Sequence, residues 1–251
     1  MDWKRILSRH SKASPRLTPD LEERIRRSFD EASRDEEHFP STIDPRIYHV
    51  KLLLDHLGDL SGKRALDVGC GKGRFARILK ERCPEAEIWG LDISEEMLKH
   101  VPEGVRTRAG SMTELPFESE SFDLVYSSIV LQHLRSRDEV ERFISELVRL
   151  TARDGLAVFQ VPDAISLRYR LQPRRRAYAL LRALGLRPRA LYRRGLNPIQ
   201  VRALDESRVF ELVEAAGGRV ARVVADSSVP PLTSKRYFVT SAAGPRSTSS
   251  A

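Results

Sequence analysis

Apolar and polar residues alternate along this chain in two patterns. Short runs rich in β-branched and other apolar residues, bounded by glycine, aspartate or proline, predict strands, and stretches with an apolar residue at every third or fourth position predict helices. The predicted strands are 64–69, 87–92, 105–110, 122–128, 155–161, 219–225 and 236–241. The predicted helices between them are 73–82, 94–100, 137–150 and one that runs from Asp205 to Gly217. Strands and helices that alternate at this spacing favour a parallel sheet with helices on both faces.

Two regions lie outside this alternation. Residues 1–60 begin with a basic arm and continue with two amphipathic patterns, which predict an N-terminal helical cap. Residues 163–204 predict an arginine-rich helical insert after the fifth strand. The sequence thus divides into the cap, a core formed by 61–162 and 205–241, the insert, and a small polar tail at 242–251 that we expect to be disordered.

A glycine-rich turn lies where the first core strand meets the first core helix. Four of its residues occupy every second position: Asp67, Gly69, Gly71 and Gly73. Glycine tolerates a positive φ and lets a ligand lie against bare backbone, while the free N–H groups of a helix start are donors. The spacing differs from the dinucleotide fingerprint, because position 74 is arginine, and Lys72 is not followed by Ser or Thr as a Walker lysine is. The turn therefore predicts a nucleotide-like ligand of another kind.

Further blocks follow this turn in a fixed order. The second strand ends in Asp92, about twenty residues beyond the turn, where a carboxylate can accept hydrogen bonds from two ribose hydroxyls. Ser94 is a good cap for the next helix. Residues 110–134 then read GSMTELPFESESFDLVYSSIVLQHL. Over residues 62–162 these blocks resemble the class I S-adenosylmethionine (SAM) dependent methyltransferases, of the small-molecule type with a methyltransferase domain 11/25-like pattern.

The resemblance implies an α/β fold with a Rossmann-like, seven-stranded, mostly parallel sheet, an antiparallel last strand, and SAM as cofactor. It assigns the glycine turn and its acid to the methionine end of the cofactor, and Asp92 to the ribose. Ile93 and Met112 would flank the adenine. Ser111 stands where relatives commonly have an acid for the adenine amino group, so the charge-assisted part of that hydrogen bond is lost. Ser127, at the end of the fourth strand, completes the predicted cofactor-binding residues. Related enzymes build their substrate lid after the fifth strand, so the resemblance implies that the insert at 163–204 is a lid that shapes the acceptor pocket.

Methyl transfer from a sulfonium is an in-line displacement. The protein must hold the donor, align the acceptor and, where needed, remove a proton. In this fold the segment after the fourth strand faces the transferred methyl, and His133 there could accept a proton, because an unperturbed imidazole titrates near pH 6.5. The alternative for His133 is a structural role at the start of a helix. Asp163, just beyond the predicted fifth strand, is a second candidate base.

The formal net charge of +8 is unevenly distributed. Residues 168–194 contain ten arginines and no acid, and a basic field of this kind concentrates anions. Three interpretations stay open: a solvated helical face, a phosphate-binding surface for RNA, and an interfacial helix with an apolar stripe. The stripe consists of Tyr178, Leu180, Leu181 and Leu184. A base-methylating enzyme is less favoured, because such enzymes usually have an Asn- or Asp-Pro-Pro-aromatic block where this chain reads SSIV.

The sequence therefore predicts a SAM-dependent methyltransferase that acts on a small-molecule acceptor, with oxygen as the expected methylated atom. The acceptor could be anionic or lipid-linked, which would suit peripheral contact with a membrane; nucleic acid is the less favoured partner. The alternatives are an RNA or protein methyltransferase and a non-catalytic SAM-fold binding module. No apolar run approaches a membrane span, and Cys70 and Cys83 fit neither a disulfide framework nor a metal site. We expect a cytoplasmic protein without a bound metal.

Overall fold

The computed structural model describes most of the predicted core and parts of the flanking regions. The described residues are 26–27, 29–30, 33–34, 60–112, 114–131, 134, 136–164, 173–187, 190–191, 193–196, 203–226 and 233–241. His133, the predicted tail at 242–251 and most of the predicted cap at 1–60 lie outside them.

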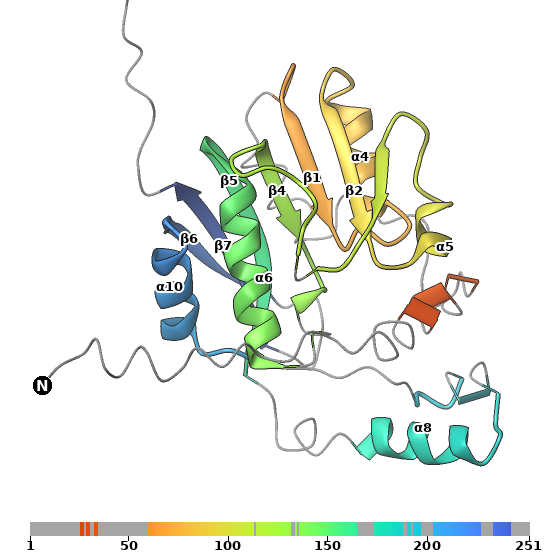
Figure 1. The fold of residues 1–251 in the computed structure, drawn as a ribbon. Helices are drawn as coiled ribbons and strands as arrows, with labels where there is room; N and C mark the ends of the chain where they lie inside the picture. Colours follow the sequence, from red (N-terminus) through yellow and green to blue (C-terminus); the bar gives the residue numbers. More distant parts are fainter. Residues whose placement is uncertain are drawn as a thin grey trace, which may run out of the picture.

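In the described part of the chain, seven strands form one sheet in the order β3-β2-β1-β4-β5-β7-β6 (Figure 1). Their bounds are β1 Arg64–Val68, β2 Glu87–Asp92, β3 Arg106–Ala109, β4 Phe122–Ser127, β5 Thr151–Ala164, β6 Gly218–Asp226 and β7 Thr233–Ser241. Strands β1 to β5 pair in parallel, whereas β7 runs antiparallel to both β5 and β6. The predicted seven-stranded, mostly parallel Rossmann-like sheet is confirmed.

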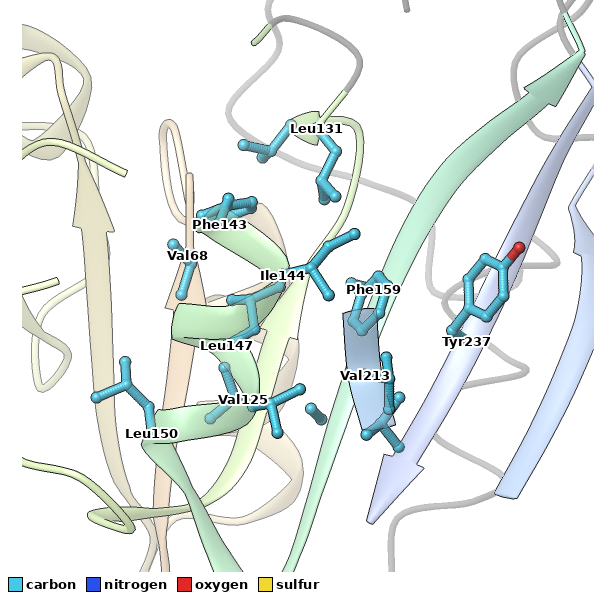
Figure 2. Packing of buried hydrophobic residues seen from close by; sticks show 14 of the residues in the cluster. Val68, Val125, Leu131, Phe143, Ile144, Leu147, Leu150, Phe159, Val213 and Tyr237 are labelled. Atoms are coloured by element: carbon cyan, nitrogen blue, oxygen red, sulfur yellow. The ribbon is translucent and has the colours of Figure 1, made fainter. Parts of the chain in front are cut away.

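Helices cover both faces of this sheet. Among the described residues these helices are α4 Arg74–Arg82, α5 Glu95–Leu98, α6 Arg137–Leu150 and α10 Glu206–Ala215, and a further helix, α8 Pro173–Ala183, lies away from the sheet (Figure 1). Apolar residues of α6 and α10 pack on one face, where Phe143, Ile144 and Leu147 of α6 lie against Val125 and Phe159 of the sheet (Figure 2). Apolar residues of α4 pack on the other face. The sheet is thus packed between two clusters of buried apolar residues, one on each face, and this packing fixes the ends of its strands.

Strand β5 is longer than the sequence predicts, since it begins at Thr151 and not at 155. The stretch before Gly155 contains polar residues and has the composition of a turn. The strand nevertheless continues through it, because the register with β4 shifts between Phe122 and Leu124. A Cβ at Gly155 would lie 2.9 Å from the Asp123 carbonyl oxygen, so glycine fits this irregularity where a larger residue would clash.

Candidate functional site

The carboxyl ends of the parallel strands meet at one edge of the sheet. The strand order reverses direction between β1 and β4, and an open α/β sheet of this kind binds ligands beside such a switch point. The glycine turn follows β1 at this edge, and its three glycines, Gly69, Gly71 and Gly73, all have positive φ, at 75°, 53° and 71°. The N–H groups of Gly69 and Cys70 donate to the Leu91 carbonyl at 2.7 and 3.0 Å. These bonds fix the turn against the end of β2.

The three glycines differ in what surrounds them. A Cβ at Gly69 would lie 2.4 Å from Val130 Cγ2, in the loop after β4, and one at Gly73 would lie 2.9 Å from Pro102 Cδ. A Cβ at Gly71 would meet no atom of the described residues within 4 Å. Packing therefore excludes side chains at the first and third positions, while the described part of the chain leaves open space beside the backbone of Gly71. This bare, open backbone is suited to a ligand that approaches closely.

Asp92 lies beside the open glycine and is held by backbone donors. Its Oδ2 accepts from the N–H of Gly71 at 2.8 Å, and its Oδ1 accepts from the N–H of Ser94 at 3.0 Å. Burial raises the pKa of Asp92, and the backbone N–H groups of Ser94, Gly71 and Ile93 oppose that rise. Each carboxylate oxygen has two lone pairs, so both oxygens can still accept a hydroxyl. The carboxylate is thus oriented and retains the capacity to bind a ribose diol.

A second acid comes from the N-terminal region. Ser94 Oγ donates to Asp30 Oδ1 at 2.6 Å while it accepts from the N–H of Met97 at 3.1 Å, so the cap of α5 is also a contact with the segment before the core. Ser33 in the same segment is buried, and its Oγ donates to the Asp30 carbonyl at 2.7 Å. The Asp30 charge contributes to the raised pKa of Asp92. Sequence reasoning missed Asp30, because no local pattern connects positions 30 and 94.

Asp67 is the acid of the glycine motif and is almost fully buried near the end of β1. Burial, and next the charge of Asp92, raise its pKa to about 7. The Arg74 guanidinium and the N–H of Ala76, both in the first turn of α4, oppose this shift. A carboxyl group with this pKa is poised to ionise when a cation arrives.

The predicted adenine-side residues come from the loops after β2 and β3. Ile93, Ser111 and Met112 are all half-buried. Met112 Cε lies 3.2 Å from the position a Cβ would take on Gly69, next to Val130. The loops after β3 and β4 therefore meet above the first glycine of the turn. Their assignment to the adenine stays a prediction.

Ser127 is fully buried at the end of β4, and its Oγ donates to the Val68 carbonyl at 3.0 Å. This bond uses the hydroxyl proton to join the ends of β4 and β1. Its oxygen can still accept a hydrogen bond, and its role toward the cofactor stays a prediction.

The loop that follows β4 is held by polar residues that sequence reasoning missed. Ile129 has a φ of 63°, unusual for a β-branched residue, and its N–H donates to Gln160 Oε1 at 3.2 Å. Ser128 Oγ donates to the same oxygen at 3.1 Å and accepts from Arg236 Nη2 at 3.1 Å. The one feature of the sequence that could have indicated these contacts is Gln160, a polar residue inside the apolar run AVFQV of β5.

One of the two predicted bases, Asp163, lies in the described part of the chain. Asp163 lies within β5, not beyond it, and pairs with Lys235 Nζ at 3.3 Å; Lys235 also binds Glu206 at the start of α10. His133 lies outside the described residues, so its catalytic assignment and that of Asp163 stay predictions.

Two properties bear on other kinds of site. Among the described residues, no helix combines the length and the apolar character needed to cross a bilayer. Within the same residues, no three histidine, cysteine, aspartate or glutamate side chains are grouped so that they could hold a metal ion.

The sheet order, the glycine turn and the acid at the end of β2 define a class I SAM-dependent methyltransferase fold. Residues 66–159 match the family model described as "Methyltransferase domain". The chain therefore contains a methyltransferase domain of the class I, SAM-dependent type, as the motifs predict.

Several relatives are methyltransferases with different acceptors. The demethylmenaquinone methyltransferase of Geobacillus kaustophilus is 35% identical over 55% of this chain and 62% of its own length. The malonyl-[acyl-carrier protein] O-methyltransferase of Laribacter hongkongensis is 32% identical over 57% of this chain and 52% of its own. A tRNA (carboxymethyluridine(34)-5-O)-methyltransferase of Arabidopsis thaliana is 30% identical over 62% of this chain and 37% of its own. The matches thus span less than two thirds of each relative.

Solved structures share the fold. A Haloferax volcanii methyltransferase, solved with the Trm112 methyltransferase activator, superposes with a TM-score of 0.63 at 16% identity, covering 86% of this chain and 97% of that one. The magnesium protoporphyrin IX methyltransferase of Synechocystis, solved with bound S-adenosylhomocysteine, superposes with a TM-score of 0.53 at 18% identity, covering 94% and 91%. At these identities the likeness extends to the fold alone.

Proposed function

We propose that this protein transfers the methyl group of SAM to a small-molecule acceptor, at an oxygen atom. The observation that carries the proposal is the arrangement around Gly71. No described residue fills the space beside its backbone, its N–H orients the Asp92 carboxylate, and the buried Asp67 carboxyl has a pKa of about 7. Together these residues provide a bare backbone, a carboxylate oriented to accept hydrogen bonds from a diol, and an acid that ionises beside a cation.

The residues present fit SAM on these grounds. Asp92 would accept the ribose hydroxyls, and Asp67 with the glycine turn would hold the methionine end, whose ammonium favours an ionised carboxylate. Ile93, Ser111 and Met112 would border the adenine. When bound, SAM supplies a methyl group activated by the positive charge of its sulfur. The chain then has to orient the two reactants and exclude water from between them.

The acceptor would lie at the loop after β4. This loop is held by hydrogen bonds among Ser128, Gln160 and Arg236. Val130 in the loop packs against Gly69 of the glycine turn. A loop fixed at both sides can align an acceptor with the cofactor, and alignment supplies much of the rate enhancement in a displacement of this kind. His133 is the candidate that would accept the hydroxyl proton, with Asp163 as the second candidate.

Relatives support the acceptor class without deciding it. One is named for demethylmenaquinone, and two carry O-methyltransferase activity in their names. An RNA acceptor is the second candidate, favoured by the arginines of residues 168–194 and by the tRNA-modifying relative; a protein acceptor shares the argument from charge. A module that binds no cofactor has less support, because it would have no use for both the intact glycine turn and Asp92. The two free cysteines, one of them buried, support a reducing compartment such as the cytoplasm.

The test is a transfer assay with methyl-tritiated SAM and a host lysate separated into small-molecule, lipid, nucleic-acid and protein fractions. Label in the small-molecule or lipid fraction, absent with the matched variant Asp92→Ala, supports the proposal. Label that becomes soluble on nuclease treatment would replace it with RNA methylation. Tight SAM binding with no labelled fraction would favour the non-catalytic module.

A further inference from the structure

Helix α8 presents large apolar side chains to solvent. Leu180 is 64% exposed and Leu184 is 69% exposed, and among the described residues they are the only large hydrophobic side chains that stand out in this way. On the opposite side of the helix Tyr178 is buried, as is Leu191 in the segment that follows. The helix is therefore anchored by its inner side, and the two leucines are left outside.

The two leucines share one face of the helix with Arg176. Residues four apart lie above one another on a helix, so Arg176, Leu180 and Leu184 form a single row. Gly185 ends the helix with a φ of 86°, and the N–H of Leu186 donates to the Leu181 carbonyl at 3.1 Å. This Schellman-type ending fixes the exposed position of Leu184 at the last turn.

The charge around this row has one sign. Residues 168–194 contain ten arginines and no acid. Arg176, in the row of the leucines, and Arg187, in the segment after the helix, are both exposed to solvent. Arg174 and Arg182 share the row of Tyr178 and are exposed as well. A pair of aliphatic side chains inside a basic surface matches an interface that has negative charge outside and hydrocarbon beneath.

Helix α8 lies on one particular side of the sheet. Figure 1 shows α8 away from the sheet, on the side toward which the carboxyl ends of β1, β2 and β4 point. The candidate methyl-transfer site lies at the same edge of the sheet. A membrane bound through α8 would thus lie on the same side of the sheet as the site.

We propose that α8, with the turn that follows it, is a docking surface for an anionic phospholipid bilayer. Leu180 and Leu184 would enter the boundary between headgroups and acyl chains, and the arginines would bind lipid phosphates. The proposal concerns this surface and holds whichever acceptor the methyl-transfer site takes.

Two other occupants fit the observations less well. Proteins that bind single-stranded RNA commonly stack bases on exposed aromatic side chains, but Tyr178 is the aromatic residue of α8 and is buried. Two exposed leucines would gain nothing from an RNA backbone. A second copy of the chain would bring two arginine-rich surfaces together, and like charges oppose that contact.

The test is cosedimentation of the full chain with vesicles of phosphatidylcholine alone and of phosphatidylcholine mixed with phosphatidylglycerol. Binding is expected to the mixed vesicles, weakened by salt. Leu180→Ser with Leu184→Ser should weaken it at least about tenfold, since two apolar anchors are lost. Arg176→Gln with Arg187→Gln should weaken it about thirtyfold, from about fivefold for each charge near an anionic surface. Arg182 is kept, because its Nη1 donates to the Leu186 carbonyl.

The matched control is Arg142→Gln with Arg219→Gln, which removes the same charge from exposed arginines elsewhere. It should weaken vesicle binding less than about twofold. A control that falls as far as the α8 variants, or no preference for the anionic vesicles, would overturn the proposal. A second measurement uses Leu184→Trp, whose emission should shift to the blue with anionic vesicles only. Unshifted emission with vesicles and a blue shift with tRNA would assign the surface to RNA instead.

Discussion

The raised pKa of Asp67 should make cofactor affinity depend on pH. Its carboxyl has a pKa of about 7, so it is largely protonated in weak acid before a ligand binds. The cofactor brings an ammonium and a sulfonium, and these cations favour the ionised carboxylate. Affinity for SAM should therefore rise as the pH rises toward 7 and then level off.

The magnitude follows from the fraction of ionised Asp67. With a pKa of about 7, the ionised fraction is about one tenth at pH 6 and about one hundredth at pH 5. Affinity should fall about tenfold per pH unit below neutrality, or about 1.4 kcal/mol per unit. The effect of pH on the stability of the ligand-free protein has the opposite sign, because that stability decreases as the pH rises. The folded pKa lies above the usual 3.8, so this group's contribution to stability is fully present below about pH 4 and is lost as the pH rises through about 7.

Isothermal titration of SAM from about pH 5.5 to about pH 7.5 measures this slope, in a range below the titration of the ligand's own amino group. The matched variant is Asp67→Asn, which should bind more weakly at the upper end and show no slope. A wild-type affinity that changes less than about twofold over the range would refute the reasoning. If the variant keeps the full slope, the titrating group is not Asp67, and Asp92 becomes the candidate.

Three further predictions concern the same edge of the sheet. Asp92→Ala should lower SAM affinity ten- to hundredfold, through the loss of about 1.5 to 3 kcal/mol of charged hydrogen bonding, and calorimetry that finds an unchanged affinity rejects the ribose assignment. Gly69→Ala should lower the free energy of unfolding by about 1 to 3 kcal/mol, because the new Cβ meets Val130 at 2.4 Å and φ is 75°. Denaturant titration should show that adding Val130→Ala to Gly69→Ala recovers part of this loss. If the losses of the two single variants simply add in the double variant, the clash is contradicted. Ser94→Ala should cost about 1 kcal/mol of stability in the same assay, as a lost helix cap and a lost contact to Asp30, and a neutral result would argue against both.

The parts of the site that are local in sequence could be predicted from it. The spacing of the three glycines and the acid at the end of the second strand depend on a few neighbouring residues, and the structure has the turn and Asp92 where the pattern indicates. The hydrogen bond from Gly71 to Asp92 then follows, because β1 and β2 are adjacent parallel strands whose carboxyl ends coincide.

Contacts between distant positions could not be predicted in this way. Arg236 lies in a strand with an alternating pattern, and arginine is rarely buried, yet its side chain is fully buried. It is accommodated because Tyr126 and Ser128 of the β4 end accept its hydrogen bonds, at 3.4 and 3.1 Å. The contact arises because β5 alone separates β7 from β4 in the sheet, which no local pattern in the sequence reveals.

The place of β7 in the sheet also has a consequence for assembly. Strand β6 precedes β7 in the chain but lies outside it in the sheet, and β7 fills the space between β5 and β6. During synthesis β6 therefore cannot reach its final pairing until residues 233–241 have left the ribosome. The half of the sheet with the glycine turn can form before that moment, since β1 to β4 are made earlier. The late insertion of β7 would then set the buried Arg236 beneath the loop after β4 as one of the last steps of folding.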